Sequence, residues 1–335
     1  MIEKPLEQGR VKLKNRIVMP PIATYKSNEE GQVTRQIIDH YRERAAGDQV
    51  GLIVTEHSYI NIQGRANAKQ LSIARDSDVE GLKRLTDAIH AEGPKVIAQL
   101  NHAGSAAPSE VTGMAPVSAS PVVLPTPQVM GDGGIPKELT EEEIKQVVCD
   151  FRDAAKRAEE AGYDGVEIHS AHAYLLNQFY SPLTNHRSDG YGGDLTGRMR
   201  IHREVIQAVR ECIGDEMIIS LRLGGCDYMD GGSTIEDSVK ASKLLEDWGV
   251  DMISVSGGMC RYTREGHEEP GYFSDMSREI KKALSIPVLL TGGVNDIKDG
   301  EELLEKGAAD LIGVGRALMK DPQWAVKAMR EFAGV

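Results

Sequence analysis

Two imidazoles and a phenol lie within six residues of one another in the chain, at His169, His172 and Tyr174. Imidazole rings can donate hydrogen bonds to a carbonyl or nitro oxygen. A phenol with an ordinary pKa of about 10 holds its proton at pH 7 and can donate it. The pattern favours polarisation of an oxygen and protonation of the substrate, as in a reduction. A metal site is the alternative, although zinc sites commonly add a cysteine or a carboxylate to such a pair.

An arginine and an amide are expected to be buried near these three side chains. Arg222 stands within an apolar run, and burying a guanidinium is costly unless an anion faces it. Either a bound ligand or a core carboxylate, such as Glu56 or Glu167, could supply that anion. Gln99 stands in a second apolar run, where its amide could contact the edge of a heterocycle or bond within the protein.

Glycine-rich segments end three other apolar runs, at residues 256–258, 291–293 and 313–316. Backbone amides of glycines, together with the start of a following helix, can hold a phosphate group. Phosphate-binding proteins of this kind include isomerases, aldolases and flavoproteins, and spacing alone does not choose among them. The residues expected to contact such a ligand are Gly258, Gly293, Gly315 and Arg316.

Eight Val/Ile/Leu-rich runs alternate with helix-like stretches and must position these residues. The runs cover residues 17–19, 50–55, 95–100, 165–168, 217–223, 252–255, 287–290 and 311–314. Helical periodicity covers residues 34–46, 78–92, 140–161, 196–213, 234–248, 274–284, 296–306 and 316–333. Eight β-then-α units predict an α/β fold, a single (β/α)8 TIM barrel, with an open doubly wound sheet as the alternative. The active site of such a barrel lies at the carboxyl ends of its strands.

The longest irregular stretch, residues 103–139, follows the third strand and contains six prolines. Because this Pro-rich loop insertion leaves from the carboxyl end of a strand, we expect it to form a lid or a wall of the site.

The chain has 335 residues, with 51 acidic and 39 basic side chains and a formal net charge of −12. This balance argues against non-specific binding to nucleic acid, and no apolar run approaches the roughly 18 residues of a membrane span. The four cysteines form no C-x-x-C pair, and the N-terminus has no apolar signal segment. We expect one domain over residues 1–335, without a metal, in the cytoplasm.

Four segments resemble the old yellow enzyme family of FMN-dependent ene-reductases and NADH oxidases. They are residues 15–21 (NRIVMPP), 99–104 (QLNHAG), 169–174 (HSAHAY) and 181–193 (SPLTNHRSDGYGG), of which the last is the most specific. The chain also resembles the N-terminal barrel of 2-enoate and 2,4-dienoyl-CoA reductases. Residues 1–335 resemble that barrel alone, and we expect the chain to lack the cysteine-rich segment and the second flavin domain of those proteins.

The resemblance implies FMN across the barrel mouth and NADH or NADPH as the hydride donor. Gln99 would contact the pyrimidine edge of the flavin, and Arg222 would stabilise the charge of the reduced ring. His169 and His172 would hold the carbonyl oxygen of an α,β-unsaturated substrate. Hydride would reach its β-carbon, and Tyr174 would protonate its α-carbon. The resemblance also assigns Gly293, Gly315 and Arg316 to the phosphate, Pro20, Pro21, Ile22, Ala23 and His57 to the flavin, and Tyr25 to the substrate.

Two positions depart from the family pattern. Ala23 stands where relatives have a Cys or Thr that tunes the flavin potential, and His57 stands where an Ala or Gly usually faces the flavin. These departures leave open an amine dehydrogenase or an NADH oxidase. An electron-transfer subunit with a redox partner protein and a flavin-free sugar-phosphate isomerase are further alternatives. Beyond these, we expect a small-molecule substrate and a homo-oligomer.

Overall fold

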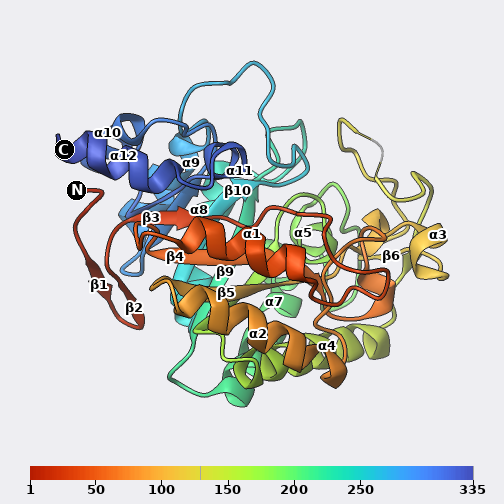
Figure 1. The fold of residues 1–335 in the computed structure, drawn as a ribbon. Coiled ribbons are helices and arrows are strands. Elements are labelled where there is room, and N and C mark those ends of the chain that lie inside the picture. The colour runs from red at the N-terminus through yellow and green to blue at the C-terminus, as the bar shows by residue number, and fades with distance from the viewer. Residues whose placement is uncertain (129, 335) are drawn as a thin grey trace.

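Eight parallel strands close into a barrel in the computed structural model, which describes residues 1–128 and 130–334 (Figure 1). Each strand pairs with the next along the chain, and the last pairs with the first, so the ring has no open edge. The predicted (β/α)8 barrel is therefore confirmed, and the open doubly wound alternative is wrong. The barrel strands are β3 (Ile17–Met19), β4 (Leu52–Tyr59), β5 (Lys95–Asn101), β8 (Gly165–Ser170), β9 (Ile218–Cys226), β10 (Met252–Gly257), β11 (Val288–Thr291) and β12 (Leu311–Gly313).

Helices follow the strands and surround the barrel (Figure 1). A capping box starts one of them: the Thr140 side chain accepts a hydrogen bond from the Glu143 backbone N–H, and the Glu143 carboxylate accepts one from the Thr140 backbone N–H. The main helices are α1 (Arg35–Ala45), α2 (Val79–His90), α4 (Glu141–Glu160), α7 (Arg200–Ile213), α8 (Ile235–Asp247), α9 (Ser274–Ala283), α10 (Ile297–Glu305) and α12 (Trp324–Ala333).

Two predicted helices are interrupted. The stretch 196–213 divides at Met199 into α6 (Leu195–Arg198) and α7. The stretch 316–333 divides into α11 (Arg316–Lys320) and α12, and Pro322 between them lacks the N–H that a continuous helix needs. The sequence also failed to predict the hairpin of β1 (Leu6–Gln8) and β2 (Val11–Leu13), and the short helix α5 (Leu175–Tyr180).

The Pro-rich insertion is less irregular than expected. It contains a short helix, α3 (Ser109–Thr112), and two strands, β6 (Val117–Ser118) and β7 (Lys137–Glu138), which pair in parallel. Val129 of this insertion lies outside the described residues. Single 3-10 turns lie at Gly104–Ala106 in this insertion and at Ile62–Gly64 and Asp76–Asp78 after β4.

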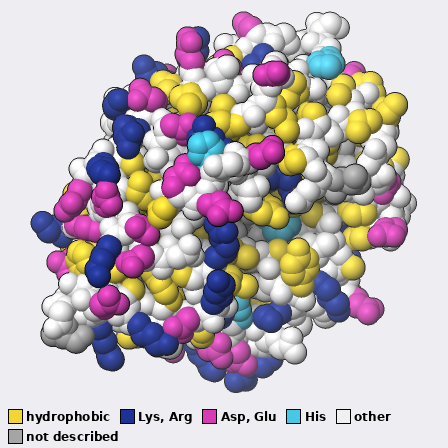
Figure 2. All heavy atoms as spheres, turned by 90° about the horizontal axis from the view of Figure 1, so that it is seen from above, with side chains coloured by type: hydrophobic (Ala, Val, Ile, Leu, Met, Phe, Trp, Pro, Cys, Tyr) yellow, Lys and Arg dark blue, Asp and Glu magenta, His cyan; other side chains and the backbone are white. Residues whose placement is uncertain are grey.

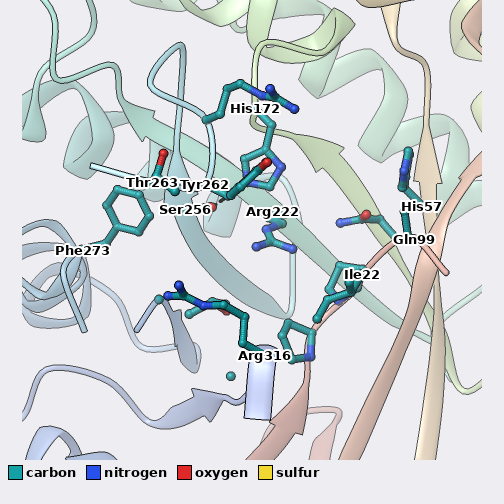
Figure 3. A pocket seen from close by; sticks show the side chains of 18 of the residues that line it. Ile22, His57, Gln99, His172, Arg222, Ser256, Tyr262, Thr263, Phe273 and Arg316 are labelled. Atoms are coloured by element: carbon teal, nitrogen blue, oxygen red, sulfur yellow. Dashed lines mark hydrogen bonds between the residues drawn. The ribbon is translucent and has the colours of Figure 1, made fainter. Parts of the chain in front are cut away.

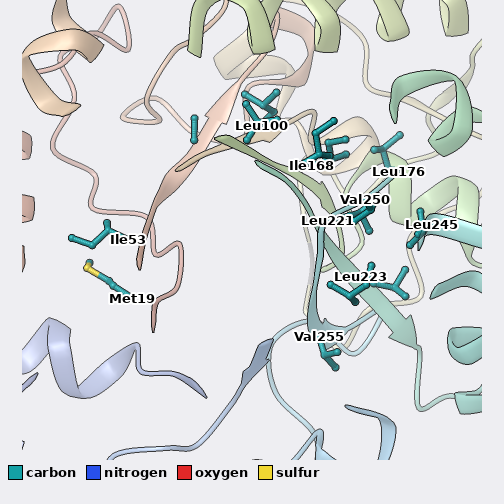
Figure 4. Packing of buried hydrophobic residues seen from close by; sticks show 14 of the residues in the cluster. Met19, Ile53, Leu100, Ile168, Leu176, Leu221, Leu223, Leu245, Val250 and Val255 are labelled. Carbon is teal, nitrogen blue, oxygen red and sulfur yellow. The ribbon is translucent and has the colours of Figure 1, made fainter. Parts of the chain in front are cut away.

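Alternation along the strands separates two apolar clusters. One face of each strand packs against the helices, with side chains such as Ile53, Leu100 and Leu221 (Figure 4). The opposite face fills the lower barrel, where Leu52, Ile97, Met252 and Leu311 meet Leu6, Val11 and Leu13 of the hairpin. The hairpin therefore closes the amino-terminal end of the barrel. Further along the same inward face, the period of two brings polar side chains to the carboxyl end.

Acidic and basic side chains are interspersed on the face shown in Figure 2. Along the helices of the whole molecule, some of these charges form pairs four residues apart, such as Arg84 with Glu80 and Lys240 with Glu236, both at 2.8 Å. The net charge of −12 is therefore not concentrated in one block on this face. No helix among the described residues is long and apolar enough to cross a membrane.

The hairpin plug gives a prediction about stability. Leu13 is buried in the lower barrel, so we expect Leu13→Ala to lower the free energy of unfolding by about 2–5 kcal/mol through lost burial and a cavity. The exposed neighbour Lys12 provides the control, since Lys12→Ala should stay within about 0.5 kcal/mol of the wild type. Thermal and denaturant unfolding measure both, and equal losses for the two variants would contradict the plug.

Candidate active site

A cavity of about 430 Å³ lies at the carboxyl ends of the barrel strands (Figure 3). Nearly all the predicted site residues meet there. Those that line it are Pro20, Pro21, Ile22, Ala23, Tyr25, His57, Gln99, His169, His172, Tyr174, Arg222, Gly293, Gly315 and Arg316.

Gly258 is the exception among the predicted residues. Its N–H donates to the Cys226 carbonyl at 3.0 Å, and a Cβ added at Gly258 would lie 2.2 Å from Oδ1 of Asp227. It therefore faces the protein behind the strand ends rather than the cavity. The glycine pair after β10 serves close packing, which the sequence pattern could not distinguish from approach to a ligand.

A strained turn after β8 presents the two histidines and the tyrosine. His172 and Ala173 have left-handed backbones, with φ of 60° and 62°, which residues other than glycine rarely adopt. Two side chains of α5 hold this turn: Asn177 Oδ1 accepts from the Ala173 N–H at 2.8 Å, and Gln178 Nε2 donates to the Ala173 carbonyl at 2.6 Å. The unpredicted helix α5 thus fixes the catalytic candidates in place.

The three rings pack edge to face. The ring centroid of His169 lies 5.0 Å from that of His172 and 5.1 Å from that of Tyr174. His57 stacks on the other side of Tyr174 at 5.7 Å and 23°. Across residues 1–128 and 130–334, no group of three or more His, Cys, Asp or Glu side chains is arranged to hold a metal ion.

Hydrogen bonds determine which ring nitrogens can donate into the cavity. Nδ1 of His169 accepts from the Ala171 N–H at 3.2 Å, which leaves Nε2 of His169 as the donor. Nε2 of His172 lies 2.7 Å from the buried hydroxyl of Ser256. If Ser256 donates to Nε2, then Nδ1 of His172 carries the second donor proton.

Burial keeps these rings neutral. It lowers the pKa of His169 and His172 well below the ordinary value, and the charge of Arg222 lowers both further. Burial likewise lowers the pKa of His57 to about 4 and raises the pKa of Tyr174 to about 12. At neutral pH the site therefore offers uncharged imidazole donors beside a fully protonated phenol.

Arg222 is buried at the inner end of the cavity without a carboxylate partner. No ion pair within 4.0 Å joins it to any described residue, and its Nε has no hydrogen-bond partner. Glu167 instead accepts from Gln99 Nε2 and from Ser220 Oγ, both at 2.9 Å. Glu56 accepts from the Thr24 hydroxyl at 2.6 Å. Among the described residues, Arg222 therefore forms no ion pair with Glu56 or Glu167, and its guanidinium lines the cavity.

Gln99 makes the internal hydrogen bond considered for it and also lines the cavity. Its Nε2 is used in the bond to Glu167, which is an internal hydrogen bond of the barrel. The side chain nevertheless lines the cavity on the inward face of β5, in register with Glu167 of β8.

Glycine backbone and an exposed arginine form the opposite end of the cavity. Gly293 has a left-handed backbone with φ of 74°, and a Cβ there would lie 2.7 Å from the Glu269 carbonyl. A Cβ on Gly315 would lie 3.0 Å from Cδ1 of Ile22. Arg316 follows at the rim with an exposed side chain. Gly293, Gly315 and Arg316, unlike Gly258, all line the cavity, and glycine backbone beside a cation suits a phosphate group.

The loop of residues 258–273, between β10 and α9, was not predicted from the sequence to be part of the site. It supplies Arg261, Tyr262, Thr263, Tyr272 and Phe273 to the cavity. Its length after a barrel strand was the available signal, since loops at this end carry function. The Pro-rich insertion, expected as the wall, supplies no lining residue among 103–128 and 130–139. It reaches this loop through Gln128, whose Oε1 accepts from Arg261 Nη1 at 2.7 Å.

The cavity is thus lined by three kinds of group: the buried Arg222, the glycine backbone beside Arg316, and the neutral imidazoles. A flat heterocycle that becomes electron-rich on reduction and carries a phosphate tail matches all three, so these residues fit FMN. The fold and site together define a flavin-dependent oxidoreductase of the barrel class.

Comparison with known proteins gives the same class. The model of the NADH:flavin oxidoreductase / NADH oxidase family matches residues 2–333. An NADH oxidase from Thermoanaerobacter brockii is 39% identical over 326 residues, which cover 96% of this chain and 49% of that protein. An NADPH dehydrogenase from Bacillus subtilis is 38% identical over 332 residues, covering 98% of this chain and 94% of that one. The solved structure of an old yellow enzyme homologue from Zymomonas mobilis matches with a TM-score of 0.85 at 28% identity, covering 100% of this chain and 93% of that one.

The chain therefore belongs to the NADH:flavin oxidoreductase / NADH oxidase family, which includes the old yellow enzymes. The predicted family and its FMN cofactor are confirmed. The chain spans about half the length of the NADH oxidase, at 49%.

The buried imidazoles give a prediction about pH. We expect the ring nitrogens of His169 and His172 to stay neutral between about pH 5 and pH 8, a window that contains the ordinary histidine pKa of about 6.5. NMR of protein labelled with ¹⁵N-histidine measures this, with His172→Gln assigning the resonances. Because the unfolded chain binds protons in this window and the buried rings do not, stability should fall as the pH decreases below about 6.5. Titration of either ring near its ordinary pKa would contradict the buried, neutral site.

Proposed function

We propose that this chain reduces α,β-unsaturated carbonyl compounds at the expense of NADH or NADPH. The observation that carries the proposal is the neutral pair His169 and His172 with the protonated Tyr174 beside it, at 5.1 Å from His169 between ring centroids. The two imidazoles can bind an oxygen of the substrate, and the phenol can donate a proton. The acceptor is a small molecule that fits beside the flavin.

The residues proposed to hold FMN all line the cavity. Arg222 and Gln99 would contact the pyrimidine edge of its ring, and Gly293, Gly315 and Arg316 its phosphate. The segment after β3 would line the ring, and the Thr24 backbone N–H anchors that segment on Glu56 at 3.1 Å. FMN, when bound, supplies the hydride chemistry between the nicotinamide and the acceptor.

The two histidines would polarise the acceptor. Nε2 of His169 and the free nitrogen of His172 can both donate to one carbonyl oxygen, which draws electron density from the conjugated double bond. Preorganised neutral donors stabilise charge that develops on this oxygen during the reaction. The charge of Arg222 lowers the pKa of both rings, after burial, and so helps to keep them uncharged at working pH.

Tyr174 would provide the proton for the α-carbon. Burial raises its pKa to about 12, so the phenol is fully protonated at pH 7. Its ring stacks on that of His57 and meets that of His169 edge to face, and these contacts hold the ring at the cavity wall. A positioned acid of this kind contributes about 10²- to 10⁴-fold to a proton transfer.

The proposal gives a test in two half-reactions. The purified protein should bind FMN, lose its flavin absorbance with NADH or NADPH, and regain it with 2-cyclohexenone. In Tyr174→Phe, reduction by the nucleotide should be unchanged, while reoxidation by the enone slows by about 10²-fold or more. Stopped-flow absorbance under anaerobic conditions measures both steps.

Ferricyanide is the matched control, because it takes electrons without needing a proton on carbon. Its reoxidation rate should be the same in Tyr174→Phe and the wild type. Equal enone rates in the two proteins would remove Tyr174 from the role of acid. Absence of any reoxidation by enones would reject the proposed reaction.

Oxidation of NADH with another acceptor is a second candidate, favoured by the 39% identity to the Thermoanaerobacter brockii NADH oxidase. A flavin that is reduced by NADH and reoxidised rapidly by oxygen, but not by enones, would support it. We also propose that residues 1–335 form a single domain and that the protein is a homo-oligomer, which size-exclusion chromatography tests. Co-purification tests an electron-transfer role with a partner protein.

A further inference from the structure

The cavity has one more arginine than FMN has positions that need a cation. Three arginines line it, Arg222, Arg261 and Arg316, and none of the described lining residues is Asp or Glu. FMN has two places that need a cation, the phosphate and the pyrimidine edge of the reduced ring. Arg316 and Arg222 lie at the two corresponding ends. Arg261 is left over.

Arg261 lies on the substrate side of the site. It packs over the ring of Tyr262 at 5.0 Å, and the ring of Tyr262 meets that of His172 at 5.9 Å. Its charge is close enough to act on both catalytic candidates: burial dominates the pKa of His172 and of Tyr174, and Arg261 acts to lower each. The guanidinium is therefore placed near the carbonyl-binding histidines.

No described carboxylate neutralises Arg261. Its Nη1 donates to the neutral amide of Gln128 at 2.7 Å, and its Nε is buried with no partner. Arg264 in the same loop differs in both respects, since it does not line the cavity and its Nη1 donates to Asp275 at 2.9 Å. The loop thus carries one paired arginine outside the cavity and one unpaired arginine inside it.

The backbone conformation at Arg261 is unusual and is held by a hydrogen bond. Its φ of 65° is in the left-handed region, which residues other than glycine rarely adopt. The Arg261 N–H closes a turn onto the Gly258 carbonyl at 2.9 Å. A guanidinium with free donors in a fixed fork matches the oxygens of a carboxylate or a phosphate.

We propose that Arg261 binds an anionic oxygen group of the acceptor, so that the preferred substrates carry a carboxylate or phosphate in addition to their conjugated carbonyl. The inference rests on the proposed function. The same anionic chemistry is present in the phosphates of the nicotinamide nucleotide, and the two half-reactions distinguish these sources.

The test compares 4-oxo-2-pentenoate with its methyl ester. The two acceptors share the 4-oxo-2-pentenoyl skeleton and its conjugated ketone, and the ester replaces the carboxylate by a neutral group. Because an ester activates the double bond more than a carboxylate does, the acid-to-ester ratio is compared between the wild type and each variant. Reoxidation of the reduced holoenzyme is followed by stopped flow for the wild type, Arg261→Gln and Arg261→Lys. FMN absorbance before mixing shows that each variant retains its cofactor.

The wild type should prefer the acid to the ester, and salt should weaken this preference by screening the charge. Arg261→Gln should lower kcat/KM for the acid by about tenfold or more, with little change for the ester. Arg261→Lys should recover part of the loss because it keeps the charge without the fork. The salt dependence of the wild type tests the proposal even if Arg261→Gln fails to fold.

Three results would overturn the inference or locate its failure. Equal acid-to-ester ratios in the wild type and Arg261→Gln would reject it while leaving ene-reduction intact. Slower flavin reduction by NADH or NADPH in Arg261→Gln, with an unchanged acid-to-ester ratio, would assign the arginine to the nucleotide and reject the acceptor site. Reduction of neither acceptor by the wild type would instead reject the proposed function.

Discussion

A buried cation without a carboxylate partner is the feature on which this site depends. Arg222 is nearly inaccessible on the inward face of β9, and burial lowers the pKa of its guanidinium, an effect that Glu167 partly offsets. Glu167 is itself bonded to Gln99 and Ser220 rather than to Arg222. Burying a cation in this position costs the folded protein free energy unless a ligand places negative charge beside it. A bound ring that becomes negatively charged on reduction would therefore stabilise the buried Arg222.

The barrel explains how such a residue can be held there. Inward positions alternate along each strand, so the same faces that carry Leu52 and Ile97 at the hairpin end carry Gln99 and His169 at the other. The apolar lower half, closed by the hairpin, provides rigidity, and the polar upper half provides the site. His169 is paired in register with Arg222 across β8 and β9. The same two strands therefore position both the imidazole proposed to bind the substrate oxygen and the buried cation.

The sequence predicted the parts of the molecule that regular periodicity encodes. Eight apolar runs and their helices indicated the barrel, and strand ends located His169, Arg222 and Gly293 correctly at the cavity. Periodicity carries no information about loops, so the loop with Arg261 and Tyr262 was missed. Gly258 was misplaced for a related reason, since a glycine beside a strand end can face either a ligand or the Asp227 side chain. Tertiary packing, rather than residue type, decides between these two outcomes.

The reduction potential of bound FMN tests the central claim most directly. If Arg222 faces the reduced ring, replacing it with Gln should lower the two-electron potential by at least about 30 mV, which corresponds to a tenfold change in the equilibrium. Spectroelectrochemical titration at saturating FMN measures this in the wild type and in Arg222→Gln, with the exposed Arg84→Gln as a control for net charge. A lower potential in Arg222→Gln alone is the predicted result. An unchanged potential would contradict the account, because the buried guanidinium would then not act on the flavin.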